Sequence, residues 1–81
     1  ALSLSRALLE ARDRVRAGER GAASLASAAR ARLEQAGARV DYVEVVHPVS
    51  LEPVARAGPG SVMLVAAFVG RTRLIDNLRL P

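Results

Sequence analysis

The densest group of side chains that can do chemistry lies near the C-terminal end of this sequence, in the stretch 70–77. It contains two arginines, a threonine hydroxyl, a carboxylate and an amide. Arg71 and Arg73 are two positions apart, so on a regular strand their side chains share one face. Two guanidinium groups side by side can bind a phosphate or a carboxylate. The alternative is a structural role, in which Arg73 and Asp76 hold a hairpin together and Asn77 binds the backbone.

The other polar residues do not form a recognisable catalytic group. His47 is the only histidine, whereas a general base needs a second polar group within hydrogen-bond reach and a metal site needs several ligands. It stands directly before Pro48 at the end of a predicted strand, so we expect an exposed or sheet-edge side chain. We therefore predict no catalytic residue and no metal ligand. The carboxylates of the second half are scattered, at Asp41, Glu44, Glu52 and Asp76.

Covalent catalysis and phosphate binding by a glycine-rich loop are not predicted either. The sequence has no cysteine, which also excludes a disulfide framework. No serine stands in the context of a nucleophile elbow. Residues 58–60 (Gly-Pro-Gly) superficially suggest a phosphate loop, but Pro59 lacks the backbone N–H that a phosphate cradle needs. We expect a tight turn there.

The first half of the chain has the pattern of two helices. Residues 2–17 and 22–36 each carry an apolar stripe at helical spacing. Ser3 or Ser5 is a suitable cap for the first helix, and Gly18 and Gly37 are natural stops after the two helices. We expect the helices to pack as an antiparallel hairpin around the turn at residues 18–21.

The second half has the pattern of three strands. Residues 40–47 are rich in β-branched and aromatic side chains, and the following proline cannot join a sheet ladder. Residues 61–69 form an apolar run, which predicts a central strand covered on both faces. Residues 73–78 supply a third strand, close enough to pair with it as a hairpin. The fold class is therefore α+β, with an N-terminal helical hairpin packed on a three-stranded antiparallel sheet.

The length of 81 residues allows one small domain of marginal stability, because such a chain buries only about 60% of its unfolded surface. Tyr42 and Phe68 are the only aromatic residues, so the core must consist of leucine, valine and alanine. The predicted core residues are Tyr42, Val46, Val62, Leu64, Val65, Phe68 and Val69 from the strands, with Leu8, Val15, Leu25 and Leu33 from the helices.

The net charge of +4 invites a comparison with nucleic-acid-binding proteins. All 12 basic residues are arginine, and the whole excess lies in residues 1–39, the helical half. A nucleic-acid surface would add stacking aromatic residues or a known recognition motif, and neither is present. No apolar run is close in length to the about 20 residues that a membrane-spanning helix needs. We expect neither nucleic acid nor a membrane as a partner, and an intracellular location.

Three segments of the second half resemble the C-terminal domain of the pantothenate synthetase (pantoate–β-alanine ligase) family. They are residues 40–46 (Val-Asp-Tyr-Val-Glu-Val-Val), 51–53 (Leu-Glu-Pro) and 70–77 (Gly-Arg-Thr-Arg-Leu-Ile-Asp-Asn). Their order and spacing follow the family, and the last segment is the most specific of the three. The resemblance covers essentially the whole chain, although family members often carry lysine at Arg71 and an acid at His47.

This resemblance implies a ligase that joins D-pantoate to β-alanine with ATP, through a pantoyl adenylate, in pantothenate and coenzyme A biosynthesis. In the family, the ATP- and pantoate-binding residues lie in an N-terminal Rossmann-like domain, and the full-length enzyme uses ATP with Mg. The histidine-containing nucleotidyl-transferase motif and the Ser-Ser-Arg-Asn-type motif of that domain do not occur here. The resemblance therefore implies that residues 1–81 are a single C-terminal lid domain of a larger ligase. We expect this chain alone to be inactive and to bind neither ATP nor Mg.

The resemblance also indicates the partners. The lid would close on the nucleotide site of the Rossmann-like domain and exclude water that hydrolyses the adenylate. The full-length enzyme would be a cytoplasmic homodimer. No catalytic residue of the family carries over to this chain. Two alternatives stay open, a free-standing protein-interaction module and, with less in its favour, a basic nucleic-acid-binding domain. The candidate residues for the interface between lid and large domain are Arg71, Thr72, Arg73, Asp76 and Asn77.

Overall fold

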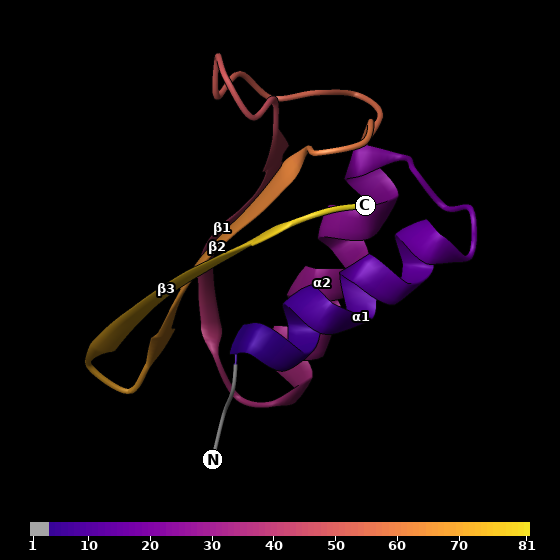
Figure 1. The fold of residues 1–81 in the computed structure, drawn as a ribbon. Helices are drawn as coiled ribbons and strands as arrows, with labels where there is room; N and C mark the ends of the chain where they lie inside the picture. Colours follow the sequence, from indigo (N-terminus) through magenta and orange to yellow (C-terminus); the bar gives the residue numbers. More distant parts are fainter. Residues whose placement is uncertain (1–3) are drawn as a thin grey trace.

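The computed structural model describes residues 4–81. Two helices, α1 (Leu4–Arg16) and α2 (Ala22–Gln35), precede three strands, β1 (Arg39–Val46), β2 (Val62–Val69) and β3 (Thr72–Arg79). The strands form one antiparallel sheet in the order β1-β2-β3. Both helices lie on the same side of this sheet (Figure 1), so the predicted α+β architecture is confirmed. Ser3, one of the two predicted caps, lies outside the described residues.

Both helices end as the glycines predict. Gly18 and Gly37 have φ values of +104° and +91°, a left-handed conformation that glycine adopts without a steric penalty. The next residue along the chain then donates its amide to a carbonyl five positions back. These hydrogen bonds are 2.9 Å from Glu19 to Arg14 and 3.1 Å from Ala38 to Leu33. Each helix is consequently closed at its C-terminal end by a glycine-dependent cap.

A two-residue turn, Gly70-Arg71, joins β2 to β3, and the residues that flank it, Val69 and Thr72, face each other across the hairpin. Gly70 has a φ of +62°, and a glycine with positive φ suits the twist of such tight hairpins. The third strand therefore starts at Thr72, one position before the predicted start. Arg71 lies in the turn, so Arg71 and Arg73 do not alternate along one regular strand.

The loop between β1 and β2 is anchored to the connection between the helices. Arg20 donates one guanidinium hydrogen bond to the carbonyl of Ala57 at 2.8 Å and another to that of Pro81 at 3.2 Å. The amide of Ala57 in turn donates to the carbonyl of Arg20 at 2.7 Å. Gly58-Pro59-Gly60 forms the predicted tight turn, closed by a 3.1 Å hydrogen bond from Ser61 to Gly58. The helical connection, this loop and the C-terminal residues are thus held together at one end of the domain.

The helices cover one face of the sheet only. On that face, Met63, Val65 and Ala67 of β2 are completely buried. The predicted core of the helices is confirmed, since Leu8, Val15, Leu25 and Leu33 are all buried, and Val46 and Val65 are buried as well. Among the described residues, no helix is long and apolar enough to cross a membrane.

Within residues 4–81 the helices cover only one face of β2, so the predicted cover on both faces is incomplete in this domain. On the face away from the helices Ala66 is buried, but Val62, Leu64 and Phe68 are only half-buried. Val69, at the hairpin end of the strand, is exposed. Tyr42 on β1 is half-buried too. The difference has a physical reason. An apolar run shows that both sides of a strand can be covered, but it does not show which covering layers the fold provides. The buried residues Met63, Ala67 and Leu80 take the places in the core that were expected of these side chains.

Candidate functional site

The side of the sheet that faces away from the helices will be called the open face. Strand register assigns its members, since paired residues point to the same side and alternate residues to opposite sides. The open face consists of Arg39, Tyr42, Glu44 and Val46 on β1, of Val62, Leu64, Ala66 and Phe68 on β2, and of Arg73, Ile75, Asn77 and Arg79 on β3.

A β-bulge in β1 adds a carboxylate to the open face. Val40 pairs with Ala67 and Tyr42 pairs with the preceding residue, Ala66, so Asp41 has no partner on β2. The extra residue interrupts the alternation of faces. As a result the Asp41 side chain reaches the same side of the sheet as Tyr42, where it meets an arginine.

That arginine is Arg73, which crosses the central strand to reach Asp41. Its Nε and Nη2 both donate to Oδ2 of Asp41, at 3.2 and 2.9 Å. Its guanidinium carbon also lies 6.0 Å from the centre of the Tyr42 ring. The two charged side chains are 43% and 42% exposed, so solvent weakens their attraction and the pair stabilises the domain only modestly.

The second aromatic ring of the open face is also paired with an arginine. Arg39 lies opposite Phe68 in the sheet register, and its guanidinium carbon is 4.5 Å from the ring centre. This distance is within the range of a cation–π interaction. Tyr42 and Phe68 therefore lie near one end of the open face, each with a guanidinium group beside it.

The five predicted interface residues do not form a single cluster. Arg71 is exposed in the hairpin turn. Thr72 pairs with Val69 and Asp76 with Val65, which places both on the helix side of β3. Arg73 and Asn77 lie on the open face.

The alternative prediction, that Arg73 and Asp76 hold the hairpin together, is therefore only partly right. Arg73 does hold the sheet together, but its partner is Asp41 instead of Asp76, because Asp76 points to the opposite side. Asp76 accepts a 2.8 Å hydrogen bond from the backbone amide of Asn77.

Sequence reasoning did not find Arg39, Asp41, Tyr42 and Phe68 as members of this surface. Tyr42 and Phe68 did carry a signal, because they are the only aromatic residues of the chain. The sequence pattern predicts both in the core, whereas the structure places them on the open face. The position of Asp41 depends on the bulge, and no residue type in Val40-Asp41-Tyr42 marks a bulge.

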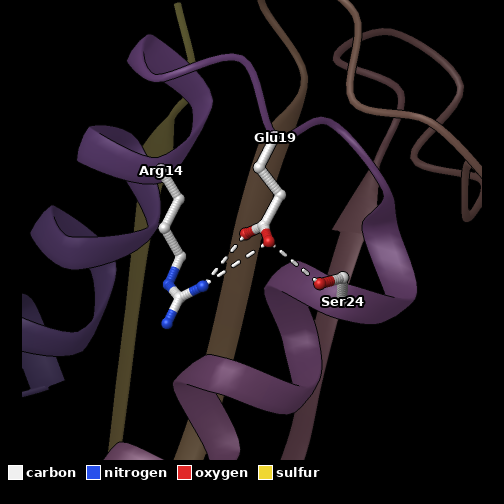
Figure 2. A network of polar contacts seen from close by, with 3 residues as sticks. All are labelled: Arg14, Glu19 and Ser24. Atoms are coloured by element: carbon white, nitrogen blue, oxygen red, sulfur yellow. Dashed lines mark hydrogen bonds and ion pairs between the residues drawn. The ribbon is translucent and has the colours of Figure 1, made fainter.

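A second polar group ties the two helices together (Figure 2). Glu19, in the connection, accepts hydrogen bonds from Nη1 of Arg14 at 3.3 and 3.5 Å and from Oγ of Ser24 at 3.1 Å. The first turn of α2 carries no acidic residue of its own, and its cap Gly21 offers no side chain. The Glu19 carboxylate thus supplies negative charge close to the start of α2, where the helix dipole favours it. This arrangement is structural.

His47 is exposed, as predicted, and its ring has a local structural role. Nδ1 accepts hydrogen bonds from the backbone amides of Val49 at 3.1 Å and Ser50 at 3.3 Å. The nitrogen lone pair that a base or a metal ligand would use is therefore occupied by the loop. Across residues 4–81, no three histidine, aspartate or glutamate side chains gather closely enough to hold a metal ion.

Residues 1–79 match the model of the pantoate-beta-alanine ligase family. Pantothenate synthetase of Anaeromyxobacter dehalogenans (strain 2CP-C) is 67% identical over 81 residues, which are 100% of this chain and 28% of that protein. Pantothenate synthetase of Myxococcus xanthus (strain DK1622) is 50% identical, over 99% of this chain and 28% of that protein.

The fold is also similar to that of a solved structure. The crystal structure of pantothenate synthetase from Thermus thermophilus superposes with a TM-score of 0.85 at 35% identity. The match covers 96% of this chain and 29% of that one. The chain therefore spans less than a third of the length of the relatives that it matches.

Proposed function

The chain belongs to the pantoate-beta-alanine ligase family, and we propose that it is the C-terminal lid domain of a pantothenate synthetase. The full-length enzyme would join D-pantoate to β-alanine with ATP, through a pantoyl adenylate. One observation carries this proposal. Nearly the whole chain matches proteins named pantothenate synthetase, yet it spans only 28% of their length. Most of such an enzyme thus lies outside the matched region.

The chemistry of the described residues supports a lid in preference to a reaction centre. They bring no group of three metal-ligating side chains together, and the chain has no cysteine and one histidine, whose Nδ1 is hydrogen-bonded to its own loop. We therefore assign ATP and Mg to an N-terminal Rossmann-like domain of the same polypeptide. The contribution of the lid is to cover the adenylate, because water would otherwise compete with β-alanine for the activated carboxyl group.

We assign the predicted interface residues to this lid function in two groups. Arg71, exposed at the tip of the hairpin, presents its charge to the large domain or its anionic substrates. Arg73, on the open face, contributes to the same contact together with Asp41, to which it is paired. Asn77 lies on the same face as Arg73. Thr72 and Asp76 belong to the helix side of β3, so they support the hairpin from behind.

The proposal is tested with Arg71→Ala and Arg73→Ala in the full-length enzyme. Steady-state kinetics for ATP, D-pantoate and β-alanine should show a lower kcat/KM for at least one substrate. Arg30→Ala is the matched control, because Arg30 is an exposed arginine on α2, away from the sheet. Unchanged kinetics for all three substrates in both variants would contradict the proposal, whereas equal losses in the control would indicate a general effect of charge.

Two wider features of the full-length protein complete the proposal. We place the enzyme in the cytoplasm, and we attribute its association into a homodimer to the large domain. The two alternatives drawn from the sequence are not favoured, because relatives at 67% and 50% identity are pantothenate synthetases of which this segment is one part.

A further inference from the structure

The central strand of the sheet is apolar on both of its sides. All eight residues of β2, Val62–Val69, are apolar, and continuous apolar runs are typical of strands that are covered on both faces. In this domain the helices cover one side. On the other side Ala66 of β2 and Val46 of β1 are buried, but Val62, Leu64 and Phe68 remain half-buried. The composition of β2 is therefore that of a strand with a second covering layer, which residues 4–81 supply only in part.

The neighbouring strand continues this apolar surface. Ile75 of β3 lies opposite Ala66 on the open face and is 61% exposed. The outer surfaces of the helices are different, because their exposed positions are mostly arginine, serine, acid and alanine. Leu9, at 40%, is the one large hydrophobic side chain of α1 and α2 that counts as exposed within the described residues. The open face, and not the helical surface, is thus suited to cover by another protein layer.

We propose that the open face is the surface on which the large N-terminal domain of the same polypeptide packs when the lid closes. This inference rests on the function proposed above. The length of the relatives supports this occupant, since 28% of their length corresponds to this chain and the remainder is ample for a folded domain. The open face is then the side of the lid that faces the substrates. The predicted interface residues do not determine this side, because Arg73 and Asn77 lie on the open face whereas Thr72 and Asp76 lie on the helix side.

The charges of the open face favour such a partner over a second copy of this chain. Arg73 is paired with Asp41, but among the described residues no carboxylate lies within ion-pair distance of Arg39 or Arg79. The face carries three arginines and, with Asp41, two carboxylates, so two copies would bring together surfaces with the same excess of positive charge. Complementary surfaces place opposite charges across an interface. The partner surface is therefore apolar, with acidic groups opposite Arg39 and Arg79.

The aromatic residues support the same assignment. Tyr42 and Phe68 both lie on the open face, with guanidinium groups at 6.0 and 4.5 Å from their ring centres. Aromatic residues and arginine dominate the binding energy of protein interfaces. The arginines shield the rings while the lid is open, and they can turn toward acidic partners when it closes.

The test measures thiol accessibility in the full-length protein, with any cysteines outside this chain replaced by serine. Ile75→Cys reports on the open face, and Leu9→Cys on α1 is the matched control. Both are labelled with a maleimide in the presence of ATP and D-pantoate. Ile75 is more exposed than Leu9 in the domain itself, at 61% against 40%, so without a partner Ile75→Cys should react at least as fast. Docking predicts that Ile75→Cys reacts at least tenfold more slowly than Leu9→Cys, and equal or faster labelling overturns the proposal.

A second measurement needs no substitution. Hydroxyl-radical footprinting of the unmodified full-length protein should show Tyr42 and Phe68 oxidised more slowly than their half-buried state in this domain predicts. Val49, which is 84% exposed on the loop after β1, is the internal reference for an exposed side chain. Protection that appears only as the protein concentration rises would identify a second copy as the occupant and overturn the proposal. Oxidation of the two rings at the rates expected from their exposure in this domain would overturn it as well.

The activity of the same preparation separates this inference from the proposed function. Pantothenate formation together with fast labelling of Ile75→Cys shows that the enzyme is correctly assigned and that the docking face is wrong. Protection of Ile75→Cys, together with an unmodified full-length protein that forms no pantothenate, supports the docking face and refutes the proposed function.

Discussion

The ion pair across the open face gives the sharpest energetic prediction. Arg73 donates twice to Oδ2 of Asp41, at 2.9 and 3.2 Å, but the two side chains are 43% and 42% exposed. Exposed pairs of this kind contribute about 0.2–1 kcal/mol, because water screens the charges and two flexible side chains must be ordered. We expect a coupling free energy of about 0.5 kcal/mol between Arg73 and Asp41.

Arg73→Ala should cost more than the coupling alone. The same guanidinium lies 6.0 Å from the Tyr42 ring centre, and an exposed cation–π contact adds about 0.5 kcal/mol. The single substitution should therefore lower the free energy of unfolding by about 1 kcal/mol. High salt should reduce the coupling to Asp41, because the screening length falls from about 10 Å at 0.1 M to about 3 Å at 1 M.

A double-mutant cycle measured by urea unfolding tests both values. The variants are Arg73→Ala, Asp41→Ala and the double variant. A parallel cycle with Asp76→Ala is the control, because Asp76 lies on the helix side of β3. The control cycle should show no coupling within error. The reasoning is refuted if Arg73 couples to Asp76 and not to Asp41, since that result would require a different face assignment for β3.

Two further predictions concern the core and the loop after β1. Met63→Ala should lower the free energy of unfolding by about 2–5 kcal/mol, because this side chain is completely buried. Leu64→Ala should cost markedly less, because Leu64 is half-buried on the open face. Equal losses for the two variants in urea unfolding would contradict the assignment of the two faces. His47→Ala should cost about 1 kcal/mol, because the amides of Val49 and Ser50 lose the acceptor Nδ1. His47→Asp should retain most of the stability, since a carboxylate can accept the same hydrogen bonds, and a loss as large as that of His47→Ala would argue against this role.

The arrangement of helices and strands could be predicted because local signals agree with the overall fold. The helical stripe that contains Leu8 and Val15 faces the sheet, and Gly18 ends the helix at the expected position with a positive φ. The change to β-branched residues near Val40 marks the start of the sheet. In each case the periodicity or the special backbone residue is itself the physical cause of the structure.

The surface chemistry could not be predicted in the same way, because it depends on strand register. One bulge places Asp41 and Tyr42 on the open face together, and the two-residue turn removes Arg71 from the strand that carries Arg73. The bulge has no signature in the residue types around it. Gly70 does mark a tight turn, but it does not show that Arg71 belongs to the turn and not to the strand. The side of β2 that the helices cover was also undetermined, because its residues are apolar on both sides. The function was inferred from the resemblance of residues 40–46, 51–53 and 70–77 to a known family, since their spacing alone indicates no reaction.

The most direct test of the central claim is the size of the native protein that contains this chain. An antibody raised against the chain would detect the product in an extract of the source cells. The chain has 8.5 kDa and spans 28% of its relatives, so 8.5 kDa divided by 0.28 predicts a band at about 30 kDa. A band at that size supports a lid domain within a pantothenate synthetase. A band at 8.5 kDa would contradict it and indicate a free-standing domain with a partner of its own.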